Sequence, residues 1–257
     1  MLAPDILQLR QFYATPFGEA VRGVIAGAIL KLWPQAQGDV VLGIGYATPY
    51  LAPYLGQETT VIACMPPAQG AEYWPHDRGN LPSDNLVLMA HDSELPFTEN
   101  SINRVLLVHS VENSEQLSYL IQEIWRILAP NGKLLAVVPN RRGMWSRSHL
   151  SPFGHGRPFN MAQMRELLSE QNLTITRTRT ALFLPPIRVK CLWKWAGKAE
   201  KIGRFICRFL GVFWGGVLLV EAEKQLYAAI HQPVVEARQY RGVLAGARPA
   251  LTMKKRI

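Results

Sequence analysis

The sequence contains little cysteine and no pattern of metal ligands. Its three cysteines, Cys64, Cys191 and Cys207, form no CxxC pair, which argues against a disulfide framework and against a cysteine-rich zinc site. There is also no HExxH motif, no Ser–His–Asp ordering and no cluster of metal-ligating side chains. We therefore expect a protein of a reducing compartment that has no metal site.

Long hydrophobic runs are missing as well. The longest one, residues 205–220, has sixteen residues with Arg208 inside it, whereas a membrane-spanning helix needs roughly 20. The N-terminus has no basic segment of the kind that opens a signal peptide, and Asp5 and Arg10 are the only charges among its first ten residues. These features predict a cytoplasmic protein.

Acidic residues are scarce in the second half only. Residues 1–140 contain 7 Lys and Arg against 13 Asp and Glu, a net charge of −6, and residues 141–257 contain 21 against 6, a net charge of +15. With 257 residues, 48% of them apolar, the chain has room for one large folded domain. We expect a single domain over residues 1–231 and a basic, disordered tail over residues 232–257.

Apolar runs without alternation predict strands that are covered on both faces, as in a parallel sheet. Such runs and two later segments predict strands at residues 39–45, 59–65, 86–90, 104–109, 133–139, 174–184 and 216–223. Helical spacing of apolar residues predicts helices at 17–32, 114–128 and 160–172. Asn113 and Gln116 predict a capping box at the start of the second helix. The alternation predicts an α/β fold with a doubly wound, mostly parallel sheet and an antiparallel edge.

Four segments of the sequence carry a resemblance to a known family. They are Asp92-Ser-Glu-Leu-Pro-Phe97, Ser101-Ile-Asn103, Val111-Glu-Asn113 and Ile124-Trp-Arg-Ile-Leu-Ala-Pro-Asn-Gly-Lys-Leu134. In motif, order and spacing the chain resembles the class I S-adenosylmethionine-dependent methyltransferases, in particular the type 11 branch that acts on small molecules. The resemblance implies a seven-stranded sheet with its last strand antiparallel, S-adenosylmethionine as the cofactor and a small molecule as the methyl acceptor.

The glycine loop of that family is matched only in part. Where the resemblance places it, the chain reads Val41-Leu-Gly-Ile-Gly-Tyr-Ala-Thr-Pro49. Gly45 stands at the first glycine position, but Ala47 and Pro49 replace the next two, and Gly43 replaces an acid. Proline lacks an N–H and fixes φ, so it cannot take over the role of the third glycine.

A second departure concerns the end of the second strand. Met65 stands where the resemblance implies an acid that binds the ribose hydroxyls, and a thioether accepts no strong hydrogen bond. Two interpretations stay open. The cofactor is bound through altered contacts, such as Tyr46, the Thr48 hydroxyl and backbone amides, or the fold is kept without the cofactor site.

In open α/β sheets, ligands bind beyond the carboxyl ends of the strands. The residues that this placement and the resemblance together assign to the cofactor are Gly43, Gly45, Tyr46, Ala47, Thr48, Met65, Asp92, Ser93 and Glu94. Asp92 is expected to accept a hydrogen bond from the adenine amine, and the alternative is that it caps a turn.

Two histidines and a basic segment are candidates for the acceptor side. His109 and His155 are candidate catalytic residues because an imidazole titrates near neutrality, although a hydrogen-bonded structural histidine and a mobile loop are equally consistent with the pattern. The candidate substrate-binding residues are Asn140, Arg141, Arg142, Trp145 and Arg157. Because a guanidinium binds carboxylate or phosphate with two hydrogen bonds, an anionic acceptor is conceivable, and a solvated loop is the alternative.

Residues 188–210 predict an amphipathic helix inserted before the last strand. This segment has seven basic residues and one acid, Glu200. On a helical wheel six of the basic residues fall within about 120°. These six are Lys190, Lys194, Lys198, Lys201, Arg204 and Arg208. The apolar remainder of the helix packs on the sheet, or the helix binds an anionic membrane surface or a partner protein. Nucleic acid is less favoured, since no RNP-like or helix-turn-helix signature is present.

Two functions are consistent with these features. The first is a methyltransferase that acts on a small acceptor, anionic or lipophilic. The second is a non-catalytic protein of methyltransferase fold that binds a partner protein or a membrane surface through its basic helix.

Overall fold

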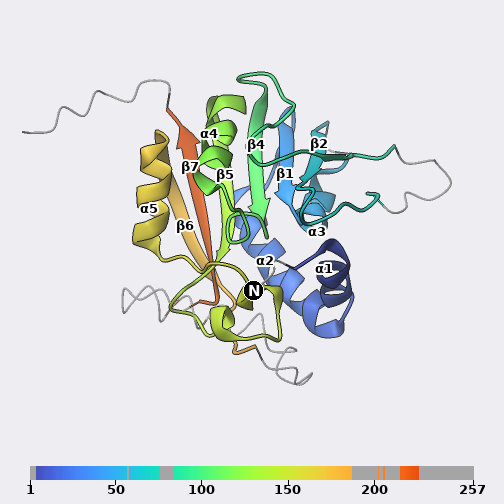
Figure 1. Cartoon of the computed structure of the whole chain (residues 1–257), viewed down its shortest axis with the longest axis vertical. Helices are drawn as coiled ribbons and strands as arrows, with labels where there is room; N and C mark the ends of the chain where they lie inside the picture. The colour runs from blue at the N-terminus through green and yellow to red at the C-terminus, as the bar shows by residue number, and fades with distance from the viewer. Residues whose placement is uncertain are drawn as a thin grey trace, which may run out of the picture. The chain divides into compact units, whose positions relative to one another are not determined.

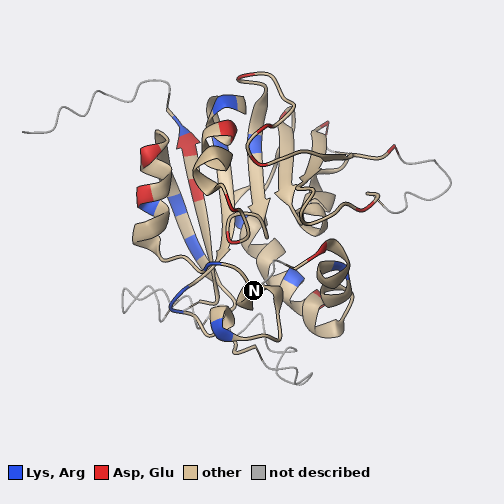
Figure 2. Ribbon diagram, viewed as in Figure 1, with Lys and Arg blue, Asp and Glu red and all other residues tan. Residues whose placement is uncertain are grey.

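The computed structural model describes residues 4–56, 58–75, 84–186 and 215–225, together with residues 202 and 205. All of them belong to the first of two compact units, Met1–Leu226. The basic helix, apart from residues 202 and 205, and the tail lie outside the described residues. The described part of the second half carries only +4 of its net charge of +15. Lys and Arg are accordingly interspersed with Asp and Glu in Figure 2.

Seven strands form one sheet in the order β3-β2-β1-β4-β5-β7-β6 (Figure 1). Their bounds are β1 Val40–Gly45, β2 Thr60–Met65, β3 Val87–Met89, β4 Ile102–Val108, β5 Leu128–Pro139, β6 Leu173–Ala181 and β7 Val217–Lys224. β1 to β5 pair in parallel, and β7 is antiparallel to both of its neighbours. The predicted fold class is confirmed. The antiparallel strand, however, lies between β5 and β6 and is not itself the edge.

Helices cover both faces of this sheet. Their bounds are α1 Ile6–Tyr13, α2 Pro16–Leu32, α3 Thr48–Leu51, α4 Leu117–Ile127 and α5 Met161–Glu170, with short 3₁₀ turns at Ala52–Tyr54, Trp145–Arg147 and Pro152–Gly154. Side chains of α1, α2 and α3 share one buried apolar cluster with one face of the sheet, and those of α4 and α5 share a second cluster with the other face. Residues of one strand alternate between the two clusters, which explains why the central strands are apolar throughout.

Two local features differ from the sequence-based expectation. The helix α1 was not expected, because eight residues give little periodicity; Asp5 and Gln8 begin it with a capping box. The capping box expected at Asn113 does not form. Instead α4 begins after Gln116 without a side-chain cap, because the Asn113 amide donates to the His109 carbonyl over 3.1 Å.

Candidate functional site

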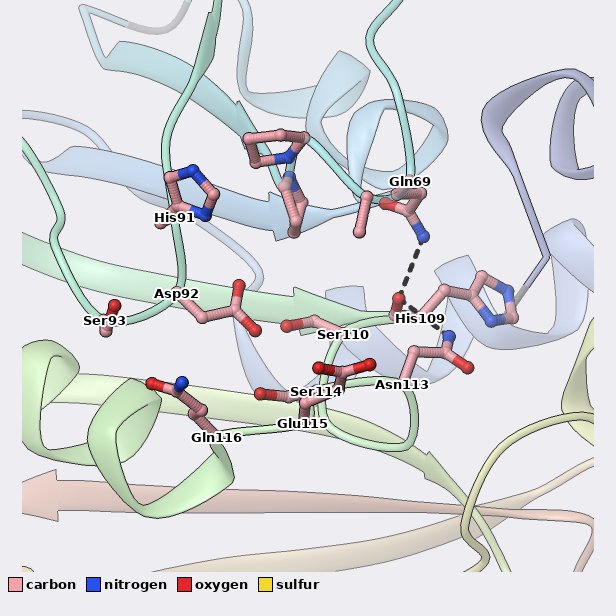
Figure 3. A pocket seen from close by; sticks show the side chains of 13 residues that line it. Gln69, His91, Asp92, Ser93, His109, Ser110, Asn113, Ser114, Glu115 and Gln116 are labelled. Carbon is pink, nitrogen blue, oxygen red and sulfur yellow. Dashed lines mark hydrogen bonds between the residues drawn. The ribbon is translucent and has the colours of Figure 1, made fainter. Parts of the chain in front are cut away.

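A cavity of about 320 Å³ lies at the carboxyl ends of β2, β3 and β4 (Figure 3). Its lining comes from the segments that follow β2, β3 and β4, which bring Gln69, Asp92 and Ser110 to one place. The other lining residues are Pro66, Pro67, Ala68, His91, Ser93, His109, Asn113, Ser114, Glu115 and Gln116. This is the edge at which α/β sheets bind ligands.

Several oxygen atoms at this cavity are buried without a hydrogen-bond partner. They include Gln69 Oε1, Asp92 Oδ1, Ser110 Oγ and Asn113 Oδ1. Buried polar atoms in proteins are almost always paired, so a group of four beside one cavity indicates a ligand that brings hydrogen-bond donors. The lining holds Asp92 and Glu115 but no Lys or Arg. The cavity is therefore matched to amines and hydroxyls rather than to phosphate.

Asp92 is the acid at the centre of this cavity. It is half-buried, and burial raises the pKa of its carboxyl, while the neighbouring Ser114 hydroxyl and His91 act to lower it. A partly desolvated carboxylate gains more from a hydrogen-bond donor than an exposed one does. Asp92 can therefore hold an exocyclic amine or a hydroxyl group of a ligand.

No residue of the loop after β1 lines the cavity. Gly45 has a φ of +80°, and a Cβ at this position would collide with the Val108 carbonyl oxygen. The Tyr46 amide donates to the same oxygen over 2.9 Å. At Gly43 an added Cβ would lie 2.6 Å from Leu51 Cδ1. Both glycines are thus required by packing within the protein.

The other predicted cofactor residues divide into two groups. Asp92 and Ser93 line the cavity, whereas Tyr46, Ala47, Thr48 and Met65 are buried and do not. Glu94 is exposed and is not part of the lining either. Two of the predicted cofactor residues thus line the cavity, and those of the loop after β1 do not.

Tyr46 and Thr48 have partners within the protein. The Tyr46 ring stacks on Tyr13 of α1, with centroids 5.6 Å apart and 24° between the planes. The Thr48 hydroxyl donates to Glu72 Oε1 over 3.0 Å. In this conformation neither side chain makes the ligand contact that the sequence suggested.

His109 is the centre of a buried hydrogen-bonded chain. Its Nδ1 lies 3.1 Å from Glu112 Oε1, its Nε2 lies 2.8 Å from the Tyr13 hydroxyl, and the Tyr50 hydroxyl donates to Tyr13 over 3.0 Å. One proton arrangement satisfies all three contacts: Tyr50 donates to Tyr13, Tyr13 donates to Nε2, and Nδ1–H donates to the Glu112 carboxylate. Burial and the nearby Tyr50 and Glu112 raise the pKa of Tyr13, which keeps its proton in place.

The backbone of His109 also belongs to the cavity. Its φ is +52°, a left-handed value that a non-glycine residue adopts only when its surroundings impose it. Its carbonyl accepts from Gln69 Nε2 and Asn113 Nδ2, each over 3.1 Å. In Figure 3 the His109 ring points away from Asp92 and Ser110, while the His109 carbonyl faces the side-chain amides of Gln69 and Asn113. His109 therefore joins the lining of the cavity to helix α1.

The residues predicted for the acceptor are not gathered at one point. Asn140 is buried and donates to the Gly215 carbonyl over 2.7 Å, and Trp145 is buried and donates to the Leu184 carbonyl over 2.8 Å. Arg141 and Arg142 are exposed. These contacts give Asn140 and Trp145 a structural role in the loop after β5.

His155 and Arg157 lie further along the same connection. The His155 ring is half-buried, with its centroid 6.1 Å from that of His149. Arg157 is exposed and lines an open groove of about 450 Å³ formed with residues of α4 and α5. This groove shares Glu115 and Gln116 with the first cavity, so Arg157 is the one predicted arginine that lies next to the site.

Of the residues that line the cavity, only Asp92, Ser93 and His109 were predicted as site residues from the sequence. Gln69 and Ser110, and Tyr13 behind them, were not. Gln69 carried a usable signal, because it is a polar residue shortly after the carboxyl end of a predicted strand. Tyr13 carried none, because its helix is 96 positions from the histidine that it contacts. Among the described residues, there is no cluster of potential metal ligands and no helix long and apolar enough to cross a membrane.

Comparisons with known proteins agree with this geometry. Residues 39–136 match the family model described as a methyltransferase domain. A search of curated proteins finds no match. The solved structures with similar folds include a SAM-dependent methyltransferase from Thermotoga maritima (TM-score 0.56, 12% identity, 86% of this chain and 96% of that one). Another is a SAM-dependent methyltransferase from Aquifex aeolicus (0.52, 12%, 86% and 98%).

A third similar structure is geranyl diphosphate C-methyltransferase from Streptomyces coelicolor (0.51, 16%, 78% and 78%). It was solved with Mg²⁺, geranyl diphosphate and S-adenosyl-L-homocysteine. The predicted resemblance to class I methyltransferases is confirmed by the family match and by the strand order. The same match supports S-adenosylmethionine as the cofactor.

Proposed function

We propose that this chain, which has a methyltransferase domain of the class I fold, is an S-adenosylmethionine-dependent methyltransferase. We propose further that its acceptor is a small molecule, anionic or lipophilic. The observation that carries the proposal is the set of unpaired buried oxygens around a cavity without Lys or Arg. The adenosine part of S-adenosylmethionine brings an amine and two ribose hydroxyls, which are the donors that such a lining calls for.

Each side chain of the cavity has a distinct task in this proposal. Asp92 accepts from the adenine amine, and the Ser110 hydroxyl and the Asn113 amide oxygen face the ribose hydroxyls. Gln69 holds the His109 carbonyl and so fixes the wall between the cavity and α1. When bound, the cofactor supplies an electrophilic methyl group on a sulfonium centre. In this proposal the His109 ring, whose two nitrogens are bonded to Tyr13 and Glu112, holds α1 against the site.

The acceptor side is assigned to the groove that Arg157 lines. It adjoins the cavity through Glu115 and Gln116, and its lining includes the apolar residues Leu117 and Phe159. Three carboxylates, those of Glu115, Glu166 and Glu170, face the single guanidinium in this lining. Of the two kinds of acceptor, the groove therefore fits a lipophilic molecule better than an anionic one.

Calorimetric titration with S-adenosylhomocysteine tests the cofactor site. We expect wild-type protein to bind and Asp92→Asn to bind about 10- to 100-fold more weakly, since a hydrogen bond to a charged group contributes about 1.5–3 kcal/mol. Asp84→Asn is the matched control, because Asp84 is exposed and does not line the cavity. Absence of binding to wild-type protein at millimolar ligand would refute the proposal.

One observation favours the second candidate function, a protein that binds a membrane through its basic segment. Ile202 and Phe205 are helical, three residues apart and 60% and 71% exposed. Residues at this spacing share one side of a helix, and in the sequence they stand among Lys198, Lys201 and Arg204. Exposed apolar side chains beside basic residues are typical of helices that lie on anionic membrane surfaces.

Co-sedimentation with vesicles that contain anionic lipid tests this second function. Ile202→Ser combined with Phe205→Ser should abolish binding, and neutral vesicles should bind weakly even with wild-type protein. Leu7→Ser combined with Leu30→Ser is the control, because both leucines are also exposed but lie on α1 and α2. If wild-type protein fails to sediment with anionic vesicles, this function is rejected.

A further inference from the structure

One loop is missing from the cavity although its position in the sheet predicts it there. β1 lies between β2 and β4 in the sheet, and the segments after β2 and β4 both line the cavity. Because β1, β2 and β4 are parallel, their carboxyl ends lie at the same edge. The loop after β1 would therefore be expected in the middle of the lining, yet none of its residues lines the cavity.

Tyr46 accounts for this difference. Its amide is bonded to the Val108 carbonyl, which holds the loop against the end of β4. Its ring is only 4% exposed and lies against Tyr13. Tyr13 in turn is anchored to His109, a lining residue of the cavity. Two stacked rings, one from the loop and one from α1, thus fill the β1 side of the site.

The charges around Tyr46 indicate what this side is built to hold. Glu72 lies beside the loop that carries Tyr46, since its Oε1 accepts from the Thr48 hydroxyl over 3.0 Å, and Arg10 belongs to the same helix as Tyr13. Burial raises the pKa of Tyr46, Glu72 raises it further and Arg10 lowers it, so both charges act on this ring. Glu72 is positioned by the Thr48 hydroxyl. A carboxylate and a guanidinium together complement the ammonium and carboxylate groups of an amino acid.

We propose that Tyr46, stacked on Tyr13, is a specificity-determining residue that closes the amino-acid side of the cofactor site. The adenosine part of the cofactor binds in the open cavity. Its amino-acid part gains contacts with Glu72 and Arg10 only when the Tyr46 ring withdraws. This inference rests on the proposed function, because it assigns the cavity to the cofactor.

Paired titrations with adenosine and with S-adenosylhomocysteine measure the effect. In wild-type protein the two ligands should bind with similar affinity, within about threefold. In Tyr46→Ala, S-adenosylhomocysteine should bind about tenfold more tightly than adenosine, which corresponds to about 1.4 kcal/mol for the newly reached charged groups. Adenosine should bind both proteins alike.

Two control variants separate the ring from its surroundings. Tyr46→Phe keeps the ring and should behave as wild type. Tyr54→Ala removes another fully buried tyrosine, whose hydroxyl donates to the Trp33 carbonyl; it reports the effect of lost packing and should leave the ligand ratio unchanged. Thermal unfolding of each variant checks that it is folded under the conditions of the titration.

The outcomes distinguish this inference from the proposed function. Tight binding of S-adenosylhomocysteine to wild-type protein, more than about tenfold above adenosine and unaffected by Tyr46→Ala, overturns the inference and leaves the proposed function intact. Absence of binding of either ligand to any variant overturns both. A ligand ratio that changes in Tyr46→Phe as much as in Tyr46→Ala overturns the role of the ring.

Discussion

Removal of the Tyr13 hydroxyl is the sharpest test of the buried chain that joins α1 to the site. Tyr13→Phe keeps the ring and its stacking on Tyr46, so it leaves no cavity. It deprives two buried groups of their partner at once, the His109 Nε2 acceptor and the Tyr50 hydroxyl donor. His109 and Tyr50 are each only 1% exposed, so water cannot replace the lost hydroxyl without a local opening of the structure.

The expected cost follows from these two orphaned groups. Leaving one buried polar group without a partner costs about 1–3 kcal/mol, and we expect Tyr13→Phe to lower the free energy of unfolding by about 2–4 kcal/mol. Tyr50→Phe should cost about 1 kcal/mol, because Tyr13 can still donate to His109. Tyr54→Phe, which removes a single buried hydrogen bond elsewhere, should likewise cost about 1 kcal/mol.

Urea unfolding followed by far-ultraviolet circular dichroism and by tryptophan fluorescence measures all three variants. If the free energy of unfolding falls with urea concentration at the same slope in the variants and in the wild type, the change lies in stability and not in the surface exposed on unfolding. A Tyr13→Phe protein that loses no more stability than Tyr50→Phe would refute the chain, because it would mean that His109 does not depend on Tyr13.

Three further predictions concern the site and the buried core. Burial raises the pKa of Asp92, so its ionised form costs stability at neutral pH. Asp92→Asn should therefore keep or raise the melting temperature of the unliganded protein while it weakens S-adenosylhomocysteine binding. A lowered melting temperature would contradict this. Gly45→Ala should cost about 2 kcal/mol or more in urea unfolding, because φ is positive there and the Cβ meets Val108. Above pH 10 the free energy of unfolding should fall by about 1.4 kcal/mol per pH unit for each buried group whose folded pKa is raised, and a flat profile in alkaline urea titrations would contradict the burial of those groups. The groups are Tyr13, Tyr46, Tyr50, Tyr54 and Cys64. Burial raises the pKa of Tyr54 and that of Cys64 to about 12.

The alkaline effect has a definite sign. In each of these groups the neutral form is favoured in the folded protein, because burial penalises the charged form. Their contribution to stability is complete below the unfolded-state pKa, about 10 for tyrosine, and is lost as the pH rises towards the folded pKa. The loss thus begins near pH 10, and somewhat lower for Cys64.

The sheet was predictable because local sequence and burial agree along it. Each central strand is covered on both faces, so its residues are apolar without alternation, and the predicted runs at 39–45 and 59–65 coincide with β1 and β2 to within one residue. The position of β7 was harder to predict, because strand order depends on pairing between distant segments. β7 pairs with both β5 and β6. β6 comes before β7 in the sequence but lies beyond it in the sheet, so the order along the chain does not give the order in the sheet.

For the site, the sequence alone identified Asp92 and Ser93, because they follow a strand and belong to a motif of known spacing. It also placed His109 at the end of β4 but left its role open. The structure shows that the His109 ring is bonded to Tyr13 and Glu112. That assignment depends on helix α1, whose eight residues are too few for their periodicity to indicate where they pack.

The sequence by itself thus determined the fold class, the methyltransferase resemblance and the presence of Asp92 at the cavity, since all three depend on local patterns of residue type. Only the tertiary structure decided that the Tyr46 ring stacks on Tyr13 and that α1 is bonded to the site through Tyr13. The physical reason is that a ring of this kind is equally apolar whether it lines a cavity or fills it. Which of the two occurs depends on the side chain that packs opposite, and in the sequence Tyr13 lies 33 positions from Tyr46.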